Sequence, residues 1–169
     1  MKKITYILVT LLIISCASVS RKIATKNKQG DLVGIITKQN FQQEPYASNW
    51  FNNSYNEYET DKKIINKLKF FIKDVTIRGF VATWCEDSQQ ILPSFYKILD
   101  EANFNYINSE IVAVNHKKKG NGLEKNLNIT QIPTFIFYKE GKEIGRFIEH
   151  PTLNSTIEKD ILKILSNNP

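Results

Sequence analysis

The sequence predicts an α/β fold, in which a central mixed β-sheet carries helices on both faces. Short apolar runs that are typical of buried strands alternate with segments whose apolar residues repeat at helical spacing. Two neighbouring runs are separated by one such helical segment, as in parallel strands joined by a crossover helix. The last two runs stand on either side of a short turn segment and predict a β-hairpin. Together these patterns indicate a sheet covered by helices.

Before the crossover unit, the chain contains a predicted strand, an aromatic segment and an amphipathic helix. The strand is Leu32–Thr37, and the aromatic segment is Phe41–Tyr58. The helical spacing of the rings in this segment favours packing against the domain over a ligand platform. These rings are Trp50, Phe51, Tyr55 and Tyr58. Asp61 is predicted to cap the helix that follows, because apolar residues repeat with helical period directly after it.

The crossover unit consists of two strands and the helix between them. Val75–Thr83 is dense in apolar residues, which predicts a strand buried on both faces, and Glu110–Asn115 is a second such strand. Pro93 falls inside the intervening helix and is expected to kink it. The apolar face of that helix comprises Ile91, Phe95, Ile98 and Ala102.

The C-terminal part of the sequence predicts a short helix, a hairpin and a final helix. The short helix is Leu123–Asn128, and the hairpin joins Thr134–Tyr138 to Glu143–Ile148. Ser155–Glu158 has the pattern of a capping box and opens the last helix.

The N-terminus carries an apolar segment that is too short to span a bilayer and fits the core of a signal peptide. This segment ends in Ile13–Cys16, which resembles the lipobox of bacterial lipoproteins, whose cysteine is acylated and becomes the first mature residue. The resemblance implies a signal peptide at 1–15, a lipidated tether at 16–31 and a domain at 32–169. An ordinary cleaved signal peptide with a coincidental Cys16 is the alternative.

Composition restricts the classes of partner. The net charge of +6 is scattered, and the one basic run, Lys117–Lys119, fits a solvated loop better than a nucleic-acid surface. Of the two cysteines, Cys16 is unavailable for pairing if it is acylated, which leaves Cys85 as a single thiol in the domain. One thiol and two histidines that lie far apart in the sequence do not make a structural metal site, and no cofactor is expected.

Cys85 occupies the junction between a predicted strand and a predicted helix. The free amide groups at a helix N-terminus favour a thiolate, which is the form that attacks disulfides. The acidic neighbours Glu86 and Asp87 oppose this effect. A buried and inert cysteine is the alternative, although the position at a strand end argues against it.

Four motifs resemble the thioredoxin family in their order and spacing. Trp84-Cys85-x-x-Ser88 matches Trp-Cys-x-x-Cys with the second cysteine replaced, and Pro93 matches the proline of the following helix. Ile132-Pro133-Thr134 matches the segment with a cis proline that faces the cysteine, and a hairpin follows it. The resemblance implies the thioredoxin fold and thiol–disulfide chemistry. It also places Gly79 where thioredoxins carry a buried acidic residue.

The resemblance assigns roles to the residues around Cys85. Cys85 would be the nucleophile, and Ser88 would either hydrogen-bond the thiolate or cap helix amides. Trp84, Ile132 and Pro133 would form the substrate surface. We also consider Glu149 or His150 as a proton donor, because they end the last strand near the expected site, although both would be merely exposed residues on the alternative interpretation.

The sequence therefore predicts an oxidoreductase of the bacterial cell envelope that exchanges thiols and disulfides through Cys85 alone. Its substrates would be disulfides of proteins or small thiols, with an external thiol as reductant. Lipid on Cys16 would hold it at a membrane, facing the periplasm, and no nucleic acid would bind. The alternatives are a redox-inactive module that binds peptides or proteins, and a thiol that senses peroxide.

Overall fold

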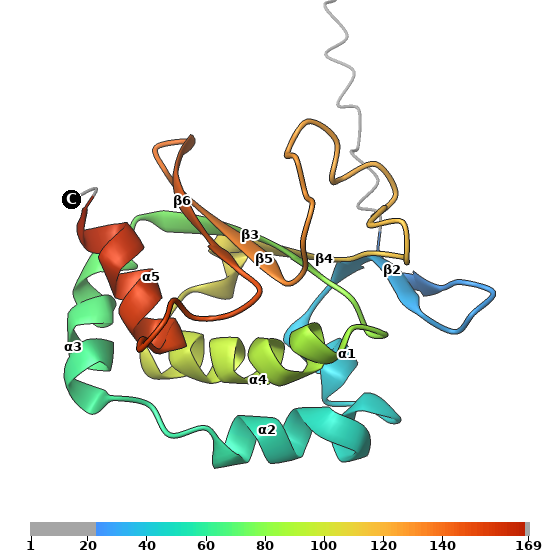
Figure 1. The fold of residues 1–169 in the computed structure, drawn as a ribbon, viewed down its shortest axis with the longest axis horizontal. Helices are drawn as coiled ribbons and strands as arrows, with labels where there is room; N and C mark the ends of the chain where they lie inside the picture. The colour runs from blue at the N-terminus through green and yellow to red at the C-terminus, as the bar shows by residue number, and fades with distance from the viewer. Residues whose placement is uncertain (1–22, 168–169) are drawn as a thin grey trace, which may run out of the picture.

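The computed structural model describes residues 23–167, which form one six-stranded sheet with helices gathered on one side (Figure 1). The strand order is β1-β2-β4-β3-β5-β6, in which β3 and β4 are parallel and all other neighbours are antiparallel. The strands are β1 Thr25–Lys26, β2 Leu32–Ile36, β3 Val75–Val81, β4 Ser109–Ala113, β5 Thr134–Lys139 and β6 Lys142–Ile148. The predicted mixed sheet and its hairpin are confirmed.

Three of the four predicted helices are present among the described residues, and four short helical elements occur in addition. The helical elements are α1 Lys38–Phe41, a π-helical turn Ala47–Phe51, α2 Asn52–Glu57, α3 Lys62–Phe71, α4 Glu86–Glu101, a 3₁₀ turn Tyr106–Asn108 and α5 Ile157–Ser166. Asp61 caps α3 as predicted, because its carboxylate accepts the amides of Lys63 and Ile64. Pro93 lies inside α4. Within the described residues, no helix is long and apolar enough to cross a membrane.

The larger core lies between the sheet and these helices. Phe95 of α4 stacks on Phe135 of β5 with 3.7 Å between ring centroids, and both side chains are fully buried. The aromatic stripe packs against this core as predicted, since Phe51 is buried and Trp50 and Tyr55 lie against it. Favourable ring contacts and large buried apolar area make this side the main source of stability.

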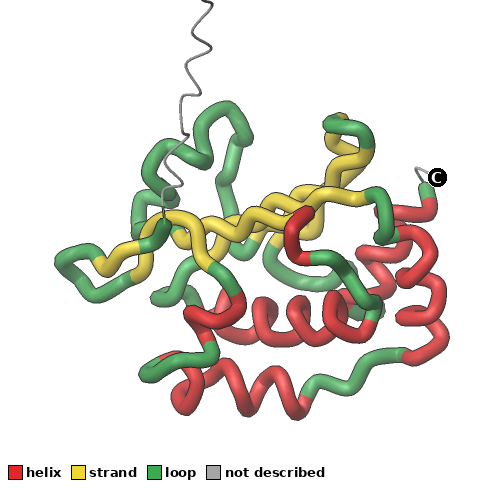
Figure 2. Tube along the Cα trace, turned by 180° about the vertical axis from the view of Figure 1, so that it is seen from behind, coloured by secondary structure: helices red, strands yellow, loops and turns green. Residues whose placement is uncertain are grey.

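The opposite face carries a loop instead of helices, so the prediction of helices on both faces is correct for one face only (Figure 2). The predicted helix Leu123–Asn128 is wrong, because this segment forms turns. Asn126 and Asn128 have φ of 63° and 51°, in the left-handed region that interrupts a right-handed helix. The residues buried under the loop are Phe80, Ala82, Val112, Val114, Ile132 and Ile136.

Several predicted boundaries also change, most of the strand ends by one or two residues. β3 ends at Val81 rather than Thr83. Thr156, not Ser155, caps α5, because the Thr156 hydroxyl accepts the Lys159 amide while Ser155 turns to Asp160. Residues 23–31 of the predicted tether are part of the fold, since β1 pairs with β2. The predicted signal peptide and Cys16 lie outside the described residues.

Candidate active site

Cys85 is the N-cap residue of α4 and is partly exposed. Its backbone amide donates to the Ala82 carbonyl at 3.3 Å, and its carbonyl accepts the Gln89 amide at 3.0 Å. The sulfur lies 3.7 Å from the Ile132 carbonyl oxygen, to which the thiol donates. The strand-to-helix turn therefore holds the sulfur beside the loop that precedes β5, and the thiol is not sealed in the core.

The loop opposite Cys85 contains the expected cis peptide bond between Ile132 and Pro133. Ile132 is buried in the smaller core, so its side chain fixes the loop while its carbonyl faces the sulfur. The Thr134 hydroxyl donates to the Gln131 carbonyl at 2.7 Å and closes the turn before the strand begins. The structure thus brings Cys85, Ile132 and Pro133 together, as the sequence resemblance implied.

Glu149 ties the same loop to the end of β6. Its amide donates to the Pro133 carbonyl at 2.8 Å, and its carboxylate accepts the side-chain amide of Gln131. Glu149 has φ of 54°, a left-handed conformation that a glycine adopts more easily. Its contacts are those of a residue that positions the proline loop.

The His150 side chain contacts the first turn of α4, at Asp87. Its Nε2 lies 3.4 Å from Asp87 Oδ1, and both side chains are substantially exposed. Asp87 is two residues after Cys85, so this pair borders the site from the side of β6. The contact described for His150 is therefore with Asp87 and not with the sulfur.

Ser88 is 1% exposed, and its hydroxyl accepts the Ala82 amide at 3.1 Å. This contact joins the first turn of α4 to the end of β3. Gln89 makes a second link of the same kind, since its side-chain amide donates to the Thr83 carbonyl at 2.8 Å. The hydroxyl therefore accepts a hydrogen bond from a backbone amide, as in the capping alternative. The amide, however, belongs to the segment after β3 and not to α4.

Trp84 is held from two directions. Its indole N–H donates to the Val114 carbonyl at 3.1 Å, and its ring stacks on His116 with 4.1 Å between centroids. His116 Nε2 in turn lies 3.6 Å from Asp31 Oδ2. Sequence analysis missed His116 and Asp31, because no spacing links three segments that meet only in the folded chain.

Gly79 occupies a place with no room for an acidic side chain. A Cβ atom built there would lie 2.6 Å from Ile111 Cδ1 and 2.8 Å from Phe135 Cδ1. The buried acid that thioredoxins use at this position is therefore replaced by apolar packing, and no proton can be relayed through it.

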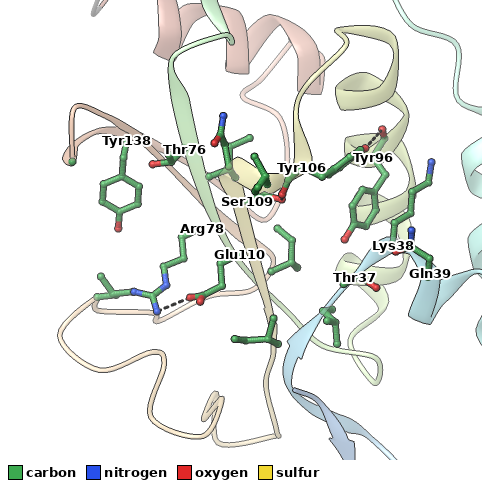
Figure 3. Close-up of a pocket in the computed structure, with 18 residues that line it drawn as sticks. Thr37, Lys38, Gln39, Thr76, Arg78, Tyr96, Tyr106, Ser109, Glu110 and Tyr138 are labelled. Atoms are coloured by element: carbon green, nitrogen blue, oxygen red, sulfur yellow. Dashed lines mark hydrogen bonds and ion pairs between the residues drawn. The ribbon is translucent and has the colours of Figure 1, made fainter. Parts of the chain in front are cut away.

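One hollow in the described surface does not include Cys85 in its lining. It has a volume of about 960 Å³ and is lined by Arg78, Glu110, Tyr106 and Tyr138 among others (Figure 3). Arg78 of β3 pairs there with Glu110 of β4 at 2.7 Å, while Tyr106 belongs to the 3₁₀ turn and Tyr138 to β5. Within residues 23–167, no group of three or more histidine, cysteine or acidic side chains could hold a metal ion.

The comparisons with known proteins agree with this geometry. The thioredoxin family pattern matches residues 56–163. A thioredoxin-like protein of Acanthamoeba polyphaga mimivirus is 30% identical over 94 residues, which cover 54% of this chain and 63% of that protein. The chain thus spans less than two thirds of that relative.

Two solved structures share the fold at low identity. A protein of unknown function from Pseudomonas aeruginosa has a TM-score of 0.53 at 16% identity, covering 70% of this chain and 81% of its own. An HIV epitope-scaffold has the same TM-score and identity and covers 70% of this chain and 82% of its own. The predicted thioredoxin fold is confirmed. With the family pattern over most of the chain and its cysteine and proline brought together, the protein belongs to the thioredoxin family.

Proposed function

We propose that this protein catalyses thiol–disulfide exchange through Cys85 alone. The observation that carries the proposal is the partly exposed Cys85 at the N-terminus of α4, beside the Ile132–Pro133 loop and with Ser88 in place of a second cysteine. The α4 amides favour negative charge on the sulfur. A thiolate formed there is ready to attack a disulfide.

The exchange proceeds in two balanced steps. The Cys85 thiolate attacks one sulfur of a substrate disulfide, forms a mixed disulfide and releases the other sulfur as a thiolate, which takes up a proton. An external thiolate then attacks the mixed disulfide, forms a new disulfide with the bound half and restores the Cys85 thiolate. The second step needs a thiol from solution, because Cys85 is the one cysteine within the described residues.

The surrounding residues supply the substrate surface and a route for the proton. Trp84, Ile132 and Pro133 flank the sulfur and would contact an extended segment of the substrate. His150, whose Nε2 lies 3.4 Å from Asp87 Oδ1, would deliver a proton to the departing thiolate. An unchanged pH dependence of turnover in His150→Ala would reject this role.

We place this activity in the bacterial cell envelope, with lipid on Cys16 as the anchor. The support is the lipobox-like Ile13–Cys16 after an apolar segment of signal-peptide length. Metabolic labelling with a fatty acid should mark the wild-type chain and should not mark Cys16→Ala. Labelling of both chains, or of neither, would remove the anchor from the proposal.

The test of the exchange uses a mixed disulfide between glutathione and a small thiol, with glutathione as reductant. Turnover should be abolished in Cys85→Ala, and mass spectrometry should find the mixed disulfide on Cys85 in the wild-type chain. If Cys85→Ala retains full turnover, the mechanism is wrong. Peptide binding that survives Cys85→Ser, without any turnover in the wild-type chain, would instead favour the redox-inactive binding module.

A further inference from the structure

The loop between β4 and β5 carries four lysines around one hollow. The hollow has a volume of about 380 Å³, and its lining includes Lys117, Lys118, Lys119 and Lys125, which we call the basic loop surface. We propose that the basic loop surface docks the domain on an anionic phospholipid membrane. This interaction is separate from thiol exchange.

The hollow has one acidic group, and that group is turned inward. The Glu124 side chain is 8% exposed, and its carboxylate accepts the Gly120 amide at 3.0 Å. Its other oxygen lies 3.8 Å from Lys119 Nζ, which is the one lysine of the four with a described ion pair among residues 23–167. The positive charges therefore face solvent while the compensating carboxylate does not, which favours an anionic partner.

The position of the surface favours a membrane as that partner. The β1–β2 hairpin lies against the loop, since the Asn121 side chain donates to the Val33 carbonyl at 3.3 Å and His116 pairs with Asp31. The described chain begins beside this hairpin, because Ile23 bridges to Ile35 of β2. The hairpin and the loop between β4 and β5 lie on the same side of the molecule (Figure 1). Cys16 is seven residues before Ile23, so a lipid there lies within ~25 Å of Ile23 at full extension. This step alone rests on the proposed anchor.

The chemistry of the hollow also favours lipid headgroups over a protein partner. Its described lining is lysine, asparagine and Glu124, with Ile129 as the single large apolar residue. Stable protein interfaces have an apolar centre, which this surface lacks. A layer of phosphate groups needs no such centre, because lysines attract it through charge alone.

A second group of lysines provides a matched comparison. Lys63, Lys67, Lys69 and Lys73 lie on or directly after α3, at the other end of the molecule from the β1–β2 hairpin (Figure 1). They offer the same number of charges but cannot approach a membrane that holds the chain near Ile23 without turning the domain over. The basic loop surface is therefore the favoured one of the two.

Docking in this orientation places the thiol close to the membrane surface. Trp84 stacks on His116, which directly precedes Lys117, and Cys85 follows Trp84.

The test measures binding of the chain from Cys16 onward, prepared without acylation, to sedimented lipid vesicles. This chain contains both cores, which are built within residues 23–167. The vesicles consist of phosphatidylcholine alone or of a two-to-one mixture with phosphatidylglycerol. We expect binding roughly tenfold tighter or more to the mixed vesicles, and loss of this preference at high salt.

Two quadruple variants locate the binding surface. K117Q/K118Q/K119Q/K125Q should lose the preference for anionic vesicles, while K63Q/K67Q/K69Q/K73Q, which has the same net charge, should keep it. Equal loss in both variants, or no preference in the wild-type chain, would overturn the proposal. Binding to polyglutamate but not to anionic vesicles would also overturn it and would assign the surface to an acidic protein. None of these outcomes bears on the proposed thiol exchange, because turnover by Cys85 is measured in a separate assay.

Discussion

The two faces of the sheet are built in different ways and serve different purposes. The face under the helices buries a large core with stacked rings, such as Phe95 on Phe135. The other face buries a small core under a loop, and Trp84, Cys85 and Ile132 belong to it. One sheet thus combines a large core on its helix-covered face with a partly exposed thiol on its loop-covered face.

The largest difference between the faces is expected in how much stability is lost when a large apolar side chain is replaced by alanine. Phe95→Ala should lower the free energy of unfolding by about 3–5 kcal/mol, because it removes a fully buried ring and leaves a cavity. Leu127→Ala, in the loop itself and only partly buried against the smaller core, should cost about 1 kcal/mol. Urea denaturation measures both values. Similar costs would mean that the loop-covered face is as tightly packed as the other.

Gly79 tests how completely apolar packing fills the helix-covered side. Gly79→Ala should destabilise the domain by about 1–3 kcal/mol, because its Cβ would overlap Ile111 and Phe135. Gly79→Asp should cost more, since it adds an unpaired carboxylate to the same space. A tolerated aspartate in urea denaturation would show that the core can open around this position.

The pH dependence of stability should arise mainly from the helix-covered side. Burial alone would raise the pKa of the Asp100 carboxyl, but hydrogen bonds from Lys38, Tyr106 and Tyr55 outweigh it and hold this pKa below its ordinary value. The unfolded chain therefore binds more protons at acidic pH. The stabilisation is complete above the ordinary carboxyl range, near pH 4, and is lost as the pH falls below it.

Asp100→Asn should remove part of this acid sensitivity. Urea denaturation between neutral pH and about pH 3 should give a flatter dependence in the variant than in the wild-type chain. Glu124→Gln provides the comparison on the loop-covered side. Burial would raise the pKa of Glu124, but backbone amides near Gly120 and the Lys119 charge lower it. If Glu124→Gln flattened the pH dependence of unfolding more than Asp100→Asn did, the acid sensitivity would arise mainly from the loop-covered side instead.

The smallest effect should follow from His116→Ala. Loss of the ring stacked on Trp84 should cost about 0.5–1.5 kcal/mol at most, because His116 is exposed. Trp84 should become more mobile, and its fluorescence should become easier to quench with iodide. His150→Ala is the control, since it lies on the other flank of the site and does not stack on the indole. Equal quenching in the two variants would contradict a specific role for His116.

Local patterns predicted most of the fold and the centre of the site. Asp61 is predicted from the helical pattern that directly follows it, and Cys85 from its place between a strand pattern and a helix pattern. The hairpin is predicted because its strands are neighbours in sequence. Leu123–Asn128 was misassigned, because its apolar spacing gives no warning of the left-handed asparagines. The meeting of Asp31, His116 and Trp84 depends on tertiary structure and has no local signal.

The inward-facing hydroxyl of Ser88 has a consequence for how such sites diverge. Serine and cysteine differ only in the oxygen or sulfur of the side chain. Ser88 is buried three residues after Cys85, and its hydroxyl is held by the Ala82 amide. Ser88→Cys would place a second thiol three residues after Cys85, in the first turn of α4, at the expense of a weaker acceptor for the Ala82 amide. A site with one cysteine and a site with two can thus differ by a single amino-acid substitution.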